Sequence, residues 1–349
     1  MSNRTYTKEE LSAALASMGV TDQTDVSRYG SGHINDTFKV ETKRGVRYIL
    51  QRVNTDIFPP ELLKANIIRV TEFLKSRGVK SLEVVGYENP WRLYAFLEGY
   101  TSVDLVTNPK EAELAAGAFA KFQNDLAELP APRLGEIIPK FHDTVDRLRL
   151  LDEAAAADVK GRKASVAAEL AFIDRRRAEA STIVDMMRAG EIPERITHND
   201  PKINNVMLAP DGSNVVIDLD TTMPGSALYD FGDAIRFGAS TAAEDERDLS
   251  RVRLDMALFR AFSEGFISRT ARGLVRPELD NLALGALVMT FEVGLRFLTD
   301  YLDGDVYFRI DAPDQNLARA RCQFKLLADM EHHKDEMDDI VRFLTAKYM

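Results

Sequence analysis

Two short apolar segments in the middle of the chain, residues 206–208 and 215–217, are separated by a sequence that contains proline and glycine. This pattern predicts a β-hairpin, because Pro, Asp, Gly and Ser favour a turn between two strands. Asp200 and Asn205 precede the first strand, and Asp218 ends the second. A hairpin carries the chain back to the end where it began, so we expect these three polar side chains to converge.

The same residues suggest a chemistry. Asp200 and Asn205 are five positions apart, as are the Asp and Asn of the kinase signature H-R-D-L-x-x-x-N. A carboxylate that accepts a proton, with an Asn and an Asp that hold magnesium, is the set used in phosphoryl transfer. We therefore predict Asp200 as the catalytic base and Asn205 and Asp218 as the metal ligands. Asp220 would share one side of an extended strand with Asp218, where it would contact the acceptor or a second metal, or serve as a hydrogen-bonded loop residue.

Two nearby features are expected to be structural. His198 has no second His or Cys beside it to form a zinc site, so its ring is expected to hold the loop backbone. Asp230 begins an Asp-Phe-Gly triplet with the letters of the kinase D-F-G motif, but it lies thirty residues after Asp200 in a helical pattern. We expect Asp230 to brace the catalytic loop.

Composition narrows the classes of partner. The chain has 349 residues, enough for two lobes, and a net charge of −10, which argues against nucleic acid or an anionic membrane as a partner. Its single cysteine excludes a disulfide framework, and the N-terminus lacks the apolar segment of a signal peptide, so we expect a cytoplasmic protein. Residues 282–291 are apolar but too few to cross a bilayer, which predicts a core helix.

Hydrophobic periodicity predicts an α+β, two-lobed architecture. The first hundred residues alternate as five strands of a small antiparallel sheet, with one helix inserted after the third strand. From Pro109 onward the pattern is helical apart from the hairpin. We predict a nucleotide-binding lobe at residues 1–98 and a larger, mainly helical catalytic and substrate lobe at residues 99–349.

The motifs resemble the aminoglycoside phosphotransferase and choline kinase family, whose fold is that of the protein kinases. Its H-x-D-x-x-x-x-N loop matches residues 198–205, and its I-D-x-[DE] strand end matches residues 217–220. More narrowly, residues 32–38, 49–54 and 296–308 look like those of the N-acetylhexosamine 1-kinases. Those enzymes phosphorylate the anomeric hydroxyl of N-acetylglucosamine or N-acetylgalactosamine, so the resemblance implies ATP and Mg²⁺ as cofactors and a sugar as the acceptor.

The resemblance also implies a nucleotide site in the first lobe. A glycine turn that includes Ser31 and Gly32 would cover the ATP phosphates with backbone N–H groups, and adenine would lie near Leu97. Kinases carry a lysine on the third strand, but here the strand has Gln51 and Arg52, which point to opposite faces. Charge favours Arg52 for the phosphate contact, with Gln51 as the alternative.

Polar residues from both lobes are expected to reach the sugar. Hydroxyl groups require hydrogen-bonding side chains, and a sugar ring packs on an aromatic face. The residues assigned to this role are His33, Asn35, Asp36, Arg296, Asp300 and Tyr307. The competing interpretations are a solvent-facing turn for Asn35 and Asp36, and a helix end with solvated charges for the last three.

Two alternatives differ in function. The acceptor could be another sugar, an amino alcohol such as choline or homoserine, or an aminoglycoside, although choline calls for an aromatic cage and the single tryptophan, Trp91, lies in the first lobe. The absence of the strand lysine motivates a non-catalytic nucleotide-binding module. The complete set of Asp200, Asn205 and Asp218 argues against that module.

Overall fold

The computed structural model describes residues 5–30, 34–103, 106, 108–130 and 132–349. The chain divides into two compact units. Unit 1 comprises Met1–Thr101, Glu128–Ile138 and Met207–Met223, and unit 2 comprises Ser102–Ala127, Pro139–Val206 and Pro224–Met349. The first segment of unit 1 therefore ends close to the predicted boundary at residue 98, but the predicted hairpin also belongs to this unit.

Unit 1 is built on an antiparallel sheet of five strands, as predicted. Its strands follow the order β1 (Gln23–Arg28), β2 (Asp36–Thr42), β3 (Arg47–Arg52), β5 (Trp91–Ala95) and β4 (Val84–Glu88). Sequence neighbours pair directly except where α2 (Pro60–Ser76) is inserted between β3 and β4.

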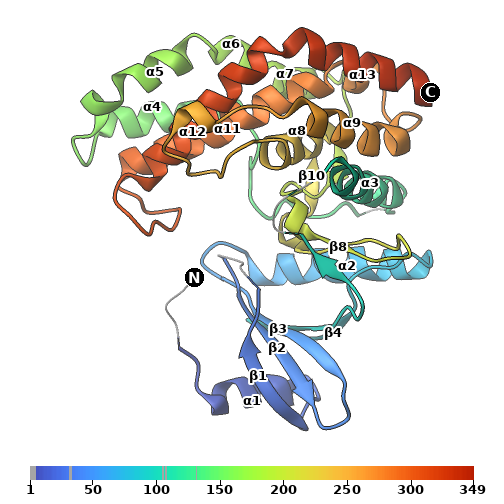
Figure 1. Cartoon of the computed structure of the whole chain (residues 1–349). Coiled ribbons are helices and arrows are strands. Elements are labelled where there is room, and N and C mark those ends of the chain that lie inside the picture. The colour runs from blue at the N-terminus through green and yellow to red at the C-terminus, as the bar shows by residue number, and fades with distance from the viewer. Residues whose placement is uncertain (1–4, 31–33, 104–105, 107, 131) are drawn as a thin grey trace. The chain divides into compact units, whose positions relative to one another are not determined.

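The two faces of this sheet have different environments. Helix α1 (Lys8–Ser17) packs against one face, where its Leu15 joins a core with Phe38, Leu50 and Leu93 (Figure 1). The side chains of a strand alternate between faces, so Gln51 and Arg92, which are cross-strand partners, lie on the other face.

The central hairpin also forms as predicted. Strands β8 (Val206–Leu208) and β9 (Val215–Val216) pair, and β6 (Thr101–Ser102) extends the sheet on the β8 side. The short 3₁₀ helix η3 (Leu219–Thr221) follows β9 and packs against α2. The α2 side chain of Asn66 fixes this approach by donating to the carbonyl oxygens of Gly135 and Thr222.

Unit 2 is mainly helical. Its helices are α3 (Pro109–Leu126), α4 (Thr144–Ala157), α5 (Ala167–Asp174), α6 (Arg177–Ala180), α7 (Thr182–Arg188), α8 (Ala227–Gly238), α9 (Met256–Thr270), α10 (Arg276–Asp280), α11 (Leu282–Asp303), α12 (Gln315–His332) and α13 (Lys334–Tyr348). Its 3₁₀ helices are η1 (Lys163–Val166), η2 (Ile203–Asn205) and η4 (Leu249–Arg251). The short strand β7 (Arg195–Thr197) pairs with β10 (Met223–Gly225) and leads into the Asp200 loop.

Helix α11 is the centre of unit 2. It packs against α4, α8 and α12, and α12 runs beside it in Figure 1. The helix is long and apolar enough to span a membrane, but 89% of its most apolar window is buried inside the protein. This burial confirms the prediction of a core helix at residues 282–291. The same helix buries two carboxylates, those of Glu292 and Asp300.

Candidate active site

The loop that carries Asp200 is fixed through its backbone within unit 2. The carboxylate of Asp230 accepts hydrogen bonds from the N–H groups of His198 (2.9 Å) and Asn199 (2.7 Å), and the next N–H, of Asp200, donates to Nδ1 of His198 (3.3 Å). Gln123 of α3 donates to the same Asp230 carboxylate. These contacts confirm both structural predictions, because Asp230 braces the loop and the His198 ring holds its backbone.

The loop has an unusual backbone conformation at Asn199. This residue has φ of 62°, a left-handed conformation that asparagine tolerates better than most residues. Its side-chain oxygen accepts a hydrogen bond from Thr197 at 2.9 Å. Gly225 of β10 passes so close that an added Cβ would lie 2.2 Å from Oγ1 of Thr197, so a glycine is required there. The tight packing fixes the direction in which the chain enters Asp200.

The Asp200 side chain is paired with Lys202. Its Oδ1 lies 2.8 Å from Nζ of Lys202, and the Asn205 amide donates to the Asp200 carbonyl at 2.9 Å. Burial alone would raise the pKa of Asp200, but Lys202, His198 and Arg236 more than offset this and hold the pKa below its usual value. Asp200 is therefore a carboxylate at neutral pH. The sequence analysis did not identify Lys202, although its position two residues after Asp200 could have indicated a cation beside the carboxylate.

The two predicted metal ligands lie in different units, and each fits the role locally. The amide nitrogen of Asn205 is used by Asp200, which leaves its oxygen as the ligand atom. Asp218 is exposed in unit 1, two residues after the end of β9 and directly before η3, with φ of 57°. No cluster of three His, Cys, Asp or Glu side chains suited to a metal occurs among the described residues. Each supplies an oxygen ligand of the kind that magnesium prefers, and magnesium keeps several non-protein ligands.

Asp220 belongs to a buried polar network of unit 1. Both oxygens of its carboxylate bind the guanidinium of Arg92 (2.5 and 3.0 Å), and Asn35 donates to Oδ2 at 2.6 Å. Arg92 and Asp220 are only 1% and 3% exposed. Burial would lower the pKa of Arg92, but Asp220 raises it above its usual value. The carboxylate is thus already neutralised, which favours the hydrogen-bonded loop interpretation of Asp220 over contact with the acceptor or a second metal.

Arg92 is the member of this network that the sequence-based prediction missed. Its signal was a charged residue in the middle of an otherwise apolar central strand, since a buried charge needs a partner. Its Nε donates to Gln51 (2.9 Å), and Gln51 donates onward to Thr37 (3.0 Å). Gln51, the alternative to Arg52, therefore lies on the face that carries the Arg92–Asp220 pair.

The structure places Arg52 on the α1 face of the sheet. It is the cross-strand partner of Asp36 and Trp91, both on that face, and faces away from Arg92. This position disagrees with the assignment of Arg52 to the ATP phosphates by charge, because strand alternation separates it from the polar network.

The predicted site residues in and after the glycine turn, at positions 31–36, fall into three groups. Ser31, Gly32 and His33 lie outside the described residues. Asn35 uses both ends of its amide inside the protein, donating to Asp220 and accepting from the N–H of Asn54 at 3.0 Å.

Asp36 also lies in contacts that differ from its predicted role. Its two carboxylate oxygens bind Tyr6 (2.5 Å) and Arg28 (2.6 Å) on the α1 face of the sheet. This geometry disagrees with the prediction that Asp36 reaches the sugar, because its oxygens are bonded on the face opposite Arg92.

The strand end near Leu97 has the character expected of a site for an aromatic base. Leu97 is half-buried after β5. The rings of Phe96 and Tyr29 lie 6.0 Å apart, and the guanidinium of Arg47 lies 4.6 Å from the Phe96 ring. The assignment of Leu97 to the nucleotide stays a prediction.

In unit 2, Asp300 holds the loop after α11. Its carboxylate accepts hydrogen bonds from the N–H groups of Val306, Tyr307 and Phe308 at 2.7 to 2.9 Å and from the side chain of Asn316. Such a set leaves little capacity for a ligand, so the geometry disagrees with the prediction that Asp300 binds the sugar.

Arg296 stands instead within a group of aromatic rings. Its guanidinium lies 4.8 Å from the ring of Phe141, 5.6 Å from that of Phe308 and 6.0 Å from that of Tyr307. Among the described residues it makes no hydrogen bond or ion pair. Tyr307 is half exposed at this position. The predicted pair of Arg296 and Tyr307 is therefore brought together, with donors available to a ligand.

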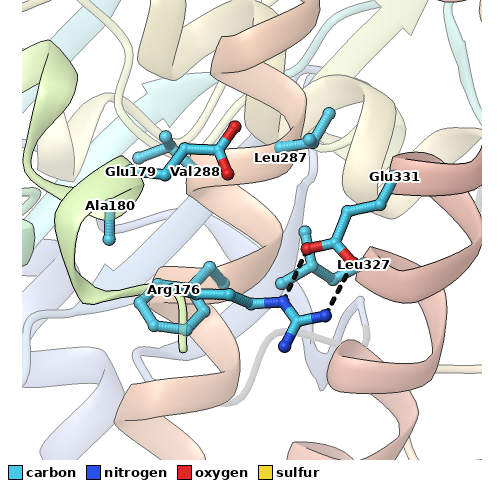
Figure 2. A pocket seen from close by; sticks show the side chains of 8 residues that line it. Arg176, Glu179, Ala180, Leu287, Val288, Leu327 and Glu331 are labelled. Atoms are coloured by element: carbon cyan, nitrogen blue, oxygen red, sulfur yellow. Dashed lines mark hydrogen bonds and ion pairs between the residues drawn. The ribbon is translucent and has the colours of Figure 1, made fainter. Parts of the chain in front are cut away.

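A pocket elsewhere on unit 2 has a different character. It encloses about 240 Å³, open mouth included, and Figure 2 shows Arg176 and Glu331 paired across it beside apolar side chains that include Leu287 and Leu327. The guanidinium of Arg176 donates to both oxygens of Glu331 at 2.5 and 2.7 Å. The volume is below that of a typical ligand pocket, and its two charges neutralise each other. It does not qualify as the substrate site.

Comparison with known proteins places the chain in a family. A model of the phosphotransferase enzyme family, abbreviated APH, matches residues 25–264, well over half of the chain. An ethanolamine kinase of Plasmodium vivax is 14% identical, with a TM-score of 0.62 over 92% of this chain and 91% of its own. An aminoglycoside phosphotransferase of Alicyclobacillus acidocaldarius is 13% identical, with a TM-score of 0.61 over 99% and 98%.

A third similar structure was solved with ligands. It is an amicoumacin kinase in complex with AMP-PNP, Ca²⁺ and Ami, 12% identical, with a TM-score of 0.57 over 95% of this chain and 94% of its own. At these identities the three structures show the fold, and they confirm the predicted α+β, protein-kinase-like architecture. The match over residues 25–264 shows more, and the chain belongs to the phosphotransferase enzyme family as a small-molecule phosphotransferase.

Proposed function

We propose that this phosphotransferase transfers the γ-phosphate of ATP to the anomeric hydroxyl of an N-acetylhexosamine, either N-acetylglucosamine or N-acetylgalactosamine. The observation that carries the proposal is Arg296, whose guanidinium lies among the rings of Phe141, Tyr307 and Phe308 with no partner of its own in the described part of the chain. A guanidinium supplies several fixed N–H donors, and a ring face packs against a sugar.

A hydrogen-bonded connection supports assigning this cluster to the acceptor. The residue after Phe141 is His142, whose Nε2 lies 3.0 Å from the carbonyl oxygen of Asn199, directly before Asp200. The aromatic cluster and the Asp200 loop are therefore neighbours within unit 2. An acceptor held by Arg296 would therefore lie close to the loop that carries Asp200.

The charge of the cluster favours a neutral acceptor over a cationic one. Arg147 donates twice to the carbonyl of Phe141, and burial followed by the nearby charge of Arg296 lowers the pKa of Arg147. Two guanidinium groups this close repel an ammonium ion. Ethanolamine, choline and aminoglycosides all carry such ions, whereas an N-acetylhexosamine is uncharged and offers hydroxyl and amide oxygens.

The roles of the remaining residues follow from phosphoryl-transfer chemistry. The ionised Asp200 orients the acceptor hydroxyl and takes its proton as the bond to phosphorus forms, while Lys202 beside it keeps the carboxylate in place. Asn205 and Asp218 would hold magnesium, which neutralises the phosphate charge when bound. The glycine turn with Ser31 and Gly32, together with Leu97, would bind ATP.

A panel of acceptors tests the proposal. The purified chain would be incubated with ATP, magnesium and, separately, N-acetylglucosamine, N-acetylgalactosamine, galactose, choline, ethanolamine, homoserine and an aminoglycoside, and the products identified by phosphorus NMR. We expect a 1-phosphate from the N-acetylhexosamines. Turnover of an amino alcohol or an aminoglycoside in their place would contradict the acceptor.

A variant of Arg296 then tests the observation on which the proposal rests. Arg296→Met keeps the length of the side chain but removes its donors, so it should raise KM for the sugar about tenfold or more with little change in KM for ATP. Arg309→Met is the matched control, since its guanidinium belongs to an exposed pair with Asp311.

A further inference from the structure

The buried pair of Glu292 and His142 lies directly behind the catalytic loop in unit 2. The Nδ1 of His142 lies 2.9 Å from Oε1 of Glu292, and its Nε2 lies 3.0 Å from the carbonyl oxygen of Asn199. Glu292 is fully buried on α11 and His142 is 7% exposed in the turn before α4. The two side chains thus form a chain of hydrogen bonds from a core helix to the peptide that precedes Asp200.

The partners of the ring decide its protonation. A carbonyl oxygen only accepts hydrogen bonds, so Nε2 of His142 must carry a hydrogen. An ionised carboxylate also only accepts, so Nδ1 must carry one too. Burial would raise the pKa of Glu292, but His142, Arg296 and Arg147 hold it below its usual value. Each ring nitrogen of His142 therefore has a fixed hydrogen-bond partner, the carboxyl group of Glu292 on one side and the carbonyl of Asn199 on the other.

The contact point makes this pair more than a packing feature. The peptide unit between Asn199 and Asp200 is held at both ends, its oxygen by His142 and its N–H by the ring of His198 at 3.3 Å. The preceding two N–H groups are held by Asp230. Rotation of this peptide is the motion that would change the direction of the Asp200 side chain, and His142 restrains it from the oxygen side.

The energetics of burial also indicate that the pair of Glu292 and His142 has a role other than stability. An apolar pair of similar volume often fills a core with equal or greater stability than a buried ion pair. One oxygen of Glu292, Oε2, is buried without a hydrogen-bond partner among the described residues, which is an additional penalty. The cost of burying Glu292 is therefore offset by a single hydrogen bond, the one between its Oε1 and Nδ1 of His142.

We propose that His142, held by Glu292, is a positioning residue that fixes the Asn199–Asp200 peptide and thereby aims the Asp200 carboxylate at the acceptor hydroxyl. The inference rests on the proposed role of Asp200 as the base. It assigns no contact with substrate to either residue. Its consequence is kinetic, because a misplaced base slows the chemical step without weakening the binding of ATP or acceptor.

Two double variants test the inference without leaving an unpaired charge in the core. Both carry Glu292→Gln, and one adds His142→Gln, which keeps a donor near the position of Nε2, while the other adds His142→Phe, which keeps the ring but has no donor. We expect kcat of the His142→Phe variant to fall about 10- to 100-fold below that of the His142→Gln variant, since a displacement of about 1 Å at a catalytic group has effects of this size. KM for ATP and for the acceptor should agree within about twofold.

The controls separate the possible outcomes. Melting temperatures report whether both variants fold. His333→Phe is the control for loss of a histidine contact to a carbonyl, because His333 follows the end of α12 and its ring binds the carbonyl of Asp329. This variant should leave kcat unchanged. Equal kcat in the two double variants would overturn the positioning role while leaving the proposed function intact. If the parent chain transfers phosphate to no acceptor of the panel, the proposed function fails and the positioning role with it.

A spectroscopic measurement tests the protonation without any assay. Ring ¹⁵N chemical shifts of His142 in the folded parent protein at pH 7 should show hydrogens on both nitrogens, and Glu292→Gln should change the Nδ1 signal. An Nδ1 without a hydrogen in the parent would contradict the hydrogen bond from His142 to an ionised Glu292. This result does not depend on the identity of the acceptor.

Discussion

In unit 2 the segment with the candidate base is held through its backbone, whereas in unit 1 the segment with the candidate metal ligand Asp218 is held through a side chain. Asp230, His198 and His142 bind successive peptide groups of the Asp200 loop. Two residues after Asp218, the carboxylate of Asp220 is bound by Arg92 and Asn35. The difference predicts different responses to mutation. The Asp200 loop keeps its other contacts when one is lost, while the loss of one partner of a buried ion pair leaves an uncompensated charge.

The largest effect is expected at Asp200 itself. Asp200→Asn keeps the shape of the side chain but cannot take the proton of the acceptor, so kcat should fall about 10²- to 10⁴-fold. A coupled assay of ADP release measures it, with KM for ATP as the internal control. Turnover equal to that of the parent would show that Asp200 is not the catalytic base. The comparison of the two loops would then have no functional meaning.

The ion pair of unit 1 should show the next largest effect, on stability. Arg92→Met leaves Asp220 buried and unpaired, which should lower the free energy of unfolding by about 3–5 kcal/mol. Adding Asp220→Leu should restore most of this loss, because no buried charge is then left unpaired. Urea unfolding measures both, and Arg177→Met, at a largely exposed pair with Asp152, should change stability by about 0–1 kcal/mol. A similar loss at both sites would mean that burial does not distinguish them.

The backbone contacts of unit 2 should be more tolerant. Asp230→Asn replaces one acceptor oxygen by a donor, so one of the two N–H groups loses its partner. We expect a loss of about 1–3 kcal/mol in the free energy of unfolding. The fall in kcat should be smaller than for Asp200→Asn, because His198 and His142 still hold the loop. A complete loss of activity in a stably folded variant would show that Asp230 takes a direct part in catalysis.

A change at Asp218 tests its predicted role as a ligand. Asp218→Asn removes the charge but keeps one oxygen, so the magnesium concentration for half-maximal rate should rise at least about tenfold. Asp211→Asn, at the exposed tip of the same hairpin, is the matched control. An unchanged magnesium dependence would exclude Asp218 as a ligand.

The smallest effect concerns pH. The folded-state pKa of Glu292 lies below its usual value, so its ionised form contributes stability above an unfolded pKa of about 4.3 and loses it as pH falls through the lower folded value. The difference in unfolding free energy between the parent and Glu292→Gln should therefore shrink as pH falls below about 4. Denaturant unfolding at pH 7 and pH 3.5 measures it. A difference that grew on acidification would contradict the direction of the shift.

Local pattern was enough to predict the scaffold. Alternation of apolar residues predicted the five strands and the hairpin, and the apolar segment at 282–291 predicted the core helix, because these features depend on spacing along the chain. The motif also predicted that His198 and Asp230 are structural, since a kinase-like loop has to be held by something close to it. Those predictions concern residues whose partners are near in sequence or fixed by one motif.

Contacts between distant segments could not be predicted. Strand alternation predicted that Gln51 and Arg52 point to opposite faces of the sheet. Which of the two points to the α1 face was decided only by the packing of α1 against Leu50. Asp36 and Asp300 are polar residues in motifs that resemble a sugar site, yet their oxygens bind Arg28 and the N–H groups of a loop. The sequence alone does not distinguish an aspartate that binds a ligand from one that binds another part of the protein.

The sequence by itself thus determined the fold class, the family and the motif from Asp200 to Asp218, because each depends on local periodicity or on spacing within one segment. Only the tertiary structure decided that Arg92 neutralises Asp220, that Arg296 stands among three rings, and that His142 connects Glu292 to the peptide before Asp200. Those contacts join residues as much as 155 positions apart, as for Phe141 and Arg296. They are set by which side chains can share a buried space without leaving a charge or a donor unpaired.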